Sequence, residues 1–383
     1  MNELLEDGNG MRGLSDIIIN FKKGTNNYGI KDIIDLLKAN SKGADSCFVG
    51  IRNNYINIYY RGNSMMKVTF DDTGAFKEAI IHKKFWDNKL TSDYVNITDY
   101  NLLKPHKIKS KISALLGKKN VLEKERQQMI IQQNNTCTYT KWFCVDMEYI
   151  MERKNSDEDN YGRFDIVAIS TERNSNNKYV VSLVELKLGA DAFSGITDEA
   201  RLYLDNKIQN GEYLKVTDSI KIGSGIVGHF SDFIRYLEDT NYNQGASRFD
   251  VLKQEIVNVL KNYQALGLLA PQFSNLATDI DVVDIEVDPK VIFLLYSKEH
   301  TIQSLESVKK SFNNYVLSKN NKDAAHFAID KIWDDKFIAK YSTGSKKIGC
   351  IFRTPGYKGP IFSDLDISEA NGIFEKRKTW SIS

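Results

Sequence analysis

The chain has 383 residues, of which 42% are hydrophobic and 27% are charged, and these values are typical of a globular protein large enough for two domains. The formal net charge of +2 excludes a strongly basic molecule, so any nucleic-acid surface must be a local patch. The sequence has no apolar run of about 18 residues, no signal-peptide pattern and no zinc-site spacing among its four cysteines, which predicts a cytoplasmic protein without a membrane span or a structural zinc.

Residues 1–110 predict an α+β accessory domain. Helix-like apolar spacing over 14–20 and 29–38 is followed by three short strands within 47–70, which form a β-meander. We expect this meander to be a structural module. In a functional alternative its aromatic and basic side chains would be exposed, would stack on bases and would contact phosphates; these residues are Tyr55, Tyr59, Tyr60 and Arg61.

The stretch 104–119 contains six lysines and no acidic residue, and its proline favours a boundary between domains. A charge run of this kind is usually a solvated linker. If a nuclease domain follows, however, the lysines would neutralise backbone phosphates, and the candidates are Lys107, Lys109, Lys111, Lys118 and Lys119.

A helix over 120–133 and a strand within 141–153 are predicted next. The strand alternates with period two, so that Asp146 and Glu148 share one face and apolar residues share the other. An acidic turn at 155–160 then folds this strand back on the next strand, which brings Glu148 within two residues of Asp165.

The stretch 162–188 carries charges inside two apolar strands joined by a polar loop. Facing residues of an antiparallel hairpin have a constant index sum, so a loop centred near Ser175 places Asp165 opposite Glu185, with Lys187 on the same face as Glu185. Two adjacent carboxylates repel, and burying them is costly unless a cation compensates. A hard divalent cation with a lysine beside it is the chemistry of phosphodiester hydrolysis.

These residues resemble the D…(D/E)xK signature of the PD-(D/E)xK, or restriction-endonuclease-like, nuclease superfamily. The resemblance implies an α/β fold with a mixed-sheet core flanked by helices, Asp165 and Glu185 as Mg²⁺ ligands, the Leu186 carbonyl completing the metal shell, and Lys187 orienting water. The sequence departs from the signature at Phe164, which stands where the signature has proline. The alternative is a hairpin with an ordinary surface Glu/Lys pair.

The same resemblance suggests further site residues. Nucleases of this class often place an acidic residue of the preceding helix near the metal, which makes Glu125 a candidate, with Glu123 behind it; the alternative is a solvated helix glutamate. Glu148 is another candidate ligand because of its place beside Asp165. The helix after the (D/E)xK strand often offers polar side chains, so Lys221 and His229 are candidate nucleic-acid contacts, although a lone histidine is more often structural.

Downstream, a GxGxxG match at 223–228 lacks the strand context of a dinucleotide site and is rejected. Helices are predicted over 225–238, 247–266 and 300–317, and the buried strand 290–297 is predicted as a fourth, parallel member of the sheet. The tail from residue 340 has a basic cluster at 376–378 without a recognisable motif.

These features together predict a nuclease domain over 111–383 with a C-terminal elaboration. We expect a Mg²⁺-dependent endonuclease acting on DNA, with Mn²⁺ as a substitute metal and a role in bacterial restriction or phage defence by analogy alone. The alternatives are a nuclease-fold module that binds nucleic acid or a partner without cutting, and a ribonuclease. A second copy of the chain or a defence-system protein are the candidate protein partners.

Overall fold

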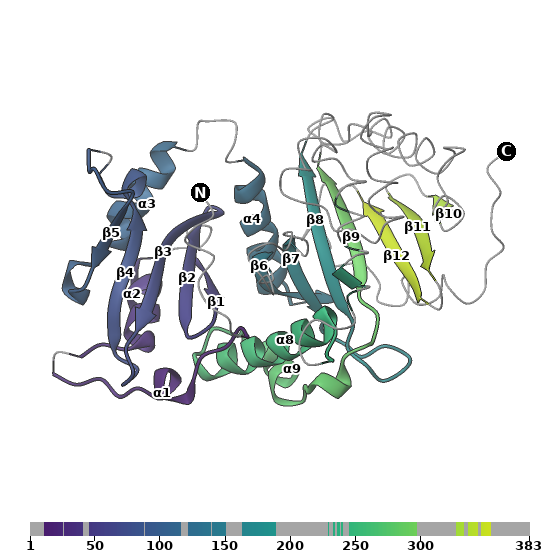
Figure 1. Ribbon diagram of the computed structural model, residues 1–383, viewed down its shortest axis with the longest axis horizontal. Coiled ribbons are helices and arrows are strands. Elements are labelled where there is room, and N and C mark those ends of the chain that lie inside the picture. The colour runs from purple at the N-terminus through teal and green to yellow at the C-terminus, as the bar shows by residue number, and fades with distance from the viewer. Residues whose placement is uncertain are drawn as a thin grey trace. The chain divides into compact units, whose positions relative to one another are not determined.

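The protein contains helices and two β-sheets, one of five strands and one of seven (Figure 1). The structure, a computed structural model, describes residues 11–25, 27–40, 46–87, 89–115, 122–138, 140–150, 163–188, 229, 233, 236–237, 239, 245–296, 327–332, 336–343 and 346–353. Two compact units divide the chain. The first comprises Met1–Thr138, Val145–Met147 and Leu252–Val282, and the second comprises Tyr139–Cys144, Glu148–Val251 and Val283–Ser383.

The first unit is built on an antiparallel meander in the order β1-β2-β3-β4-β5. Its strands are β1 (Phe48–Ile51), β2 (Tyr55–Tyr60), β3 (Asn63–Phe70), β4 (Phe76–His82) and β5 (Tyr94–Ile97). Its helices are α1 (Asp16–Ile19), α2 (Ile30–Ala39), α3 (Pro105–Leu115), α4 (Leu122–Thr136) and α9 (Ser274–Thr278), with 3₁₀ turns at Lys83–Phe85, Tyr100–Leu102 and Pro271–Phe273. The meander is therefore longer than the three strands predicted.

The turn between β2 and β3 explains why one glycine is required. Arg61 and Gly62 both have positive φ, 47° and 71°, as in the two-residue hairpin turns that match strand twist. A Cβ on Gly62 would lie 1.9 Å from the Lys124 carbonyl oxygen, and the Gly62 N–H donates to Gln128 Oε1 at 2.6 Å. This turn therefore fixes α4 against the sheet.

The tyrosines of the meander are buried, which favours the expected structural module over the alternative of an exposed stacking surface. Tyr55, Tyr59 and Tyr60 are between 2% and 6% exposed. Their rings contact cations of the same unit instead of solvent, as Lys67 Nζ lies 4.4 Å from the Tyr55 ring centroid. The alternative failed because every residue of β2 is buried, so both faces of this strand are covered.

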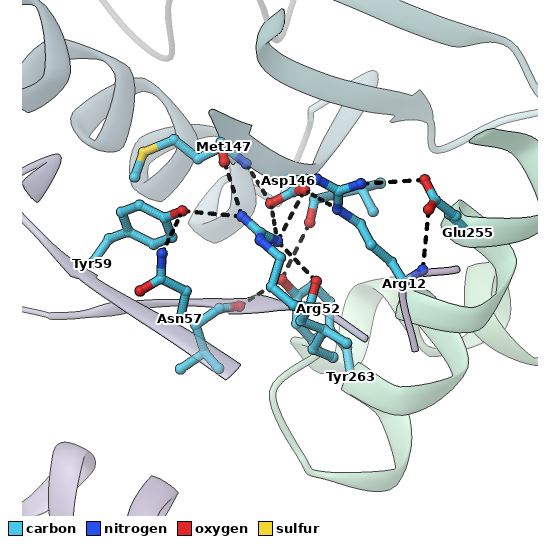
Figure 2. A network of polar contacts seen from close by, with 11 residues as sticks. Arg12, Arg52, Asn57, Tyr59, Asp146, Met147, Glu255 and Tyr263 are labelled. Atoms are coloured by element: carbon cyan, nitrogen blue, oxygen red, sulfur yellow. Dashed lines mark hydrogen bonds and ion pairs between the residues drawn. The ribbon is translucent and has the colours of Figure 1, made fainter. Parts of the chain in front are cut away.

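A buried polar network connects four chain segments within the first unit (Figure 2). Asp146 is at its centre: the Arg52 Nη1 atom lies 2.9 and 3.0 Å from its two carboxylate oxygens, and the Arg12 Nε atom lies 3.0 Å away. Arg12 also pairs with Glu255 at 3.4 Å, and the Tyr263 hydroxyl donates to the carbonyls of residues 49 and 145. Residues before 60 and after 140 are thus held in one core.

This network bears on where the chain divides. The first unit continues beyond the predicted boundary at 110 as far as Thr138, and it includes two later segments. The lysine-rich stretch at that boundary forms the helix α3. Lys107 and Lys111 are exposed on it, whereas Lys109 is buried, donates to the Asn40 carbonyl at 2.7 Å and lies over the Tyr60 ring. Lys109 is therefore a packing residue and not the phosphate contact we expected.

The second unit contains a mixed sheet in the order β10-β11-β12-β9-β8-β7-β6. Its strands are β6 (Trp142–Ile150, of which Val145–Met147 count with the first unit), β7 (Arg163–Ser170), β8 (Val181–Leu188), β9 (Lys290–Tyr296), β10 (Phe327–Ile332), β11 (Lys336–Thr343) and β12 (Lys346–Arg353). The strand β9 pairs in parallel with both β8 and β12, so the prediction of a fourth, parallel strand is confirmed. Beyond it, β10, β11 and β12 form an antiparallel extension that was not predicted.

The remaining described elements are the long helix α8 (Arg248–Ala265), which contributes to both units, and the 3₁₀ turn Val282–Asp284. The chain is also helical at residues 229, 233 and 236–237, in agreement with the helix predicted there. Lys118, Lys119 and Lys221, the glycine-rich stretch 223–228, the predicted helix 300–317 and the basic cluster 376–378 lie outside the described residues. In the described part of the chain, no helix has the length and apolar character needed to cross a membrane.

Candidate functional site

The hairpin of β7 and β8 has the register that the sequence predicts. Ile166 faces Val184 and Ile169 faces Val181, so the pairing is centred on position 175. Continued by one residue, this register places Asp165 opposite Glu185. Both strands are buried on either face, since Ile166, Val167, Leu183 and Val184 are fully buried, and β8 is enclosed between β7 and β9. Charged side chains at the end of such a pair need specific partners.

Asp165 interacts with both the backbone and the charges of β8. The Leu186 N–H donates to Asp165 Oδ2 at 2.7 Å. Burial, and then the charges of Glu185 and Glu148, raise the pKa of the Asp165 carboxyl well above its usual value, although Lys187 and the Leu186 N–H oppose this shift. The N–H and C=O of one strand residue point to the same side, so the Leu186 carbonyl is directed toward the strand that carries Asp165.

Glu185, Lys187 and His229 form a compact cluster. The Lys187 Nζ atom lies 2.6 Å from Glu185 Oε1 and 3.0 Å from His229 Nε2, and His229 Nδ1 lies 3.2 Å from the same Glu185 oxygen. Glu185 is 3% exposed and Lys187 is 7% exposed. Such burial of an ion pair distinguishes this hairpin from one with an ordinary surface Glu/Lys pair, in which both side chains would be solvated.

Four buried aromatic rings support these polar residues. Phe164 stacks on Tyr149 with ring centroids 5.7 Å apart, and it meets Phe233 and Tyr236 edge-on at 4.8 and 4.9 Å. In the sequence, Tyr149 directly follows Glu148 and Phe164 directly precedes Asp165. Phe233 lies one helical turn after His229. This packing explains why phenylalanine occupies the position before Asp165, because a proline there would remove the ring at the centre of the cluster.

The other two acidic candidates have different surroundings. Glu148 has a φ of +53°, an uncommon conformation for a non-glycine residue, and its charge acts on Asp165. Glu125 belongs to the first unit, where it is partly exposed and lies 3.8 Å from Arg61. The structure therefore brings together Asp165, Glu185, Leu186, Lys187 and His229, with Glu148 within electrostatic reach. The sequence suggested His229 as a nucleic-acid contact, with a structural hydrogen-bonding role as the alternative, but did not predict its contact with Lys187; its helical spacing from Phe233 and Tyr236 was the available signal for its position.

The donor atoms of this site fit a hard divalent cation. Two carboxylates and a backbone carbonyl are oxygen donors of the kind that Mg²⁺ and Mn²⁺ prefer, usually with several waters. Burial, and then the charges of Glu185 and Glu148, raise the pKa of Asp165 in spite of Lys187, and a bound cation would favour the ionised form. Within the described residues, no group of three or more His, Cys, Asp or Glu side chains is arranged to hold a metal.

Comparisons of the chain with protein-family models, with curated proteins and with solved structures found no match. The choice of candidate site therefore rests on its geometry and on the residue types that it brings together.

Proposed function

We propose that the chain is a metal-dependent nuclease that hydrolyses phosphodiester bonds of DNA, with Asp165 and Glu185 as carboxylate ligands and Lys187 as the residue that orients the attacking water. The observation that carries this proposal is the placement of a buried Glu–Lys pair, 2.6 Å apart, opposite an aspartate whose pKa is raised. This combination costs free energy in a structural hairpin and suits a site that meets a cation and an anionic substrate.

The roles of the residues follow from their contacts. Asp165 is oriented by the Leu186 N–H, which leaves its other carboxylate oxygen to a ligand. Glu185 is held by Lys187 and His229 on one oxygen, Oε1. In sites of this kind a divalent cation neutralises phosphate charge and lowers the pKa of the attacking water. Lys187, an ammonium beside the carboxylates, would hold the water and the phosphate in line, and the leaving oxygen would depart with a proton from solvent.

DNA is the proposed substrate, and endonucleolytic cutting is the proposed mode. We propose that the exposed side chains of Lys107 and Lys111 on α3 contact backbone phosphates of the DNA. Phosphate contacts of this kind can form at any position along a DNA strand. Mg²⁺ is the proposed cofactor, with Mn²⁺ as a substitute, and restriction or phage defence in a bacterial cytoplasm is the proposed setting by analogy. RNA cleavage and binding without cleavage are the competing functions.

The test is digestion of plasmid DNA and of a structured RNA by the full chain with Mg²⁺, with Mn²⁺ and with EDTA. Glu185→Gln and Lys187→Met are each expected to reduce the cleavage rate at least about 100-fold, because one removes a ligand charge and the other the cation beside the water. The second unit also offers a matched pair on its surface, Lys141 and Glu172, 3.2 Å apart. Glu172→Gln and Lys141→Met should cut at the wild-type rate. Wild-type cleavage by Glu185→Gln, or equal turnover in EDTA, would refute the proposal.

A further inference from the structure

His229 lies against both Glu185 and Lys187: its Nε2 atom is hydrogen-bonded to the Lys187 amine, and its Nδ1 atom lies within ion-pair distance of Glu185 Oε1. Each of the three side chains touches the other two, at 2.6, 3.0 and 3.2 Å. A lysine ammonium offers only donors, and a glutamate carboxylate offers only acceptors. The imidazole is the one side chain of the three that can either donate or accept, so the position of its hydrogen must suit its neighbours.

The hydrogen bond with Lys187 selects one form of the imidazole. Its Nε2 atom faces the Lys187 ammonium, which offers only donors, and must therefore accept. The neutral ring with the hydrogen on Nδ1 can do this. The doubly protonated ring and the Nε2–H tautomer would each point an N–H at the ammonium. In water the neutral ring favours the Nε2–H form, so this site would impose the less common one.

The helix that carries His229 is anchored at the residues that follow it. Phe233 and Tyr236 are fully buried or nearly so, and both rings pack on Phe164, which directly precedes Asp165. The Tyr236 hydroxyl also donates to the Arg248 carbonyl at 3.1 Å. The imidazole is therefore held on a rigid element whose packing is tied to the strand of Asp165, which is what a group that orients another side chain requires.

From this geometry we propose that His229 is a positioning residue that holds the Lys187 amine in place, an inference that rests on the proposed nuclease function. Glu185 Oε1 and His229 Nε2 both accept from Lys187. When a cation or a phosphate competes for the carboxylate, the imidazole still holds the amine. The competing role is direct contact of His229 with the phosphate backbone.

Two conservative variants test the hydrogen bond between His229 and Lys187. A glutamine amide reaches about as far as Nε2 and can accept from Lys187, whereas an asparagine amide ends near Nδ1 and does not reach it. We expect His229→Ala to lower kcat about 10- to 100-fold with little change in KM for DNA, the usual effect of removing a supporting partner. His229→Gln should recover most of kcat. His229→Asn should remain as slow as His229→Ala. His106→Ala, an exposed histidine on α3, is the matched control.

A readout independent of cleavage is the ¹⁵N spectrum of the imidazoles in the full chain, which has five histidines. The signal that disappears in His229→Ala should report the Nδ1–H tautomer, and in Lys187→Met it should revert toward the Nε2–H form. Three results would each overturn the inference: an Nε2–H signal in the wild type, no change of the signal in Lys187→Met, or a rise in KM with unchanged kcat in His229→Ala. The proposed nuclease function would still stand in these cases if cleavage depended on Lys187. An Nδ1–H signal without any metal-dependent cleavage would refute the proposed function, while the contact between His229 and Lys187 would stand.

Discussion

The ion pair between Arg52 and Asp146 allows a stability prediction to be worked from its contacts. Arg52 is 5% exposed and Asp146 is 3% exposed. Burial lowers the pKa of the Arg52 guanidinium, but the attraction of Asp146 outweighs it, so the pKa lies above its ordinary value and the guanidinium stays charged. Asp146→Asn keeps the shape of the side chain and removes its charge.

The expected loss of stability in Asp146→Asn follows from the contacts that Arg12 and Arg52 keep. Arg12 retains Glu255 at 3.4 Å, whereas Arg52 would keep hydrogen bonds to neutral groups, which are the carbonyls of residues 51 and 147 and the Tyr59 hydroxyl. Asp146→Asn therefore leaves one buried cation without an anion, and removing one partner of a buried pair costs about 3–5 kcal/mol. We expect a loss near the lower end of that range, because the asparagine amide can still accept a hydrogen bond.

The assay is urea unfolding followed by circular dichroism. Glu172→Gln, which breaks an exposed pair, is the matched control and should cost less than about 1 kcal/mol. The double variant Arg52→Met/Asp146→Leu should recover most of the loss, since apolar residues can replace a buried pair at little cost. A loss below about 1 kcal/mol for Asp146→Asn, or no recovery in the double variant, would show that the network does not stabilise the first unit in this way.

Three further predictions concern the second unit. Ca²⁺ should support DNA binding more than cleavage, because its coordination is looser than that of Mg²⁺, and parallel filter binding and digestion would show this; equal cutting with both metals would contradict it. Glu148→Gln should weaken Mn²⁺ binding in calorimetry by about 10-fold or more, and an unchanged affinity would remove Glu148 from the ligand set. Burial lowers the pKa of Lys290 to about 8 in spite of Asp288 and Glu286. Between about pH 8 and about pH 10.4 the Lys290 amine is protonated in the unfolded chain but not in the folded one. The stability of the wild type should therefore rise with pH across this window. Lys290→Met should thus be more stable at pH 7 by up to roughly 3 kcal/mol, a difference that should shrink by pH 10; a constant difference would contradict the assignment.

The sequence predicted the hairpin and its register because these depend on local chemistry. A polar loop between two apolar strands fixes its own centre, and alternation then sets which charges face each other. The contact of His229 with Lys187 could not be predicted in this way, because it depends on how a helix more than forty positions away docks on Phe164. The same limit applied to Tyr59 and Lys109, whose burial is decided by elements that cover the meander from distant parts of the chain.

The two units are interleaved in sequence, and this changes what a truncation can test. All the side chains proposed for hydrolysis follow residue 112, so a fragment 112–383 contains every residue of the proposed site. Asp146 and Glu255 also follow the cut, however, whereas their partners Arg12 and Arg52 precede it. Such a fragment would carry a buried Asp146 without its two arginines and a buried Glu255 without Arg12, and we expect it to unfold at a lower urea concentration than the full chain or to fail to fold.

Loss of cleavage by this fragment would therefore say nothing about where the reaction takes place. Point substitutions in the full chain are the informative experiment, since Glu185→Gln changes the site and leaves the Asp146 network intact. If the fragment 112–383 unfolded cooperatively at the same urea concentration as the full chain, the buried charges would have to be stabilised without their arginines, and the division of the chain into interleaved units would be wrong. Circular dichroism of the fragment, measured before any digestion assay, distinguishes these cases.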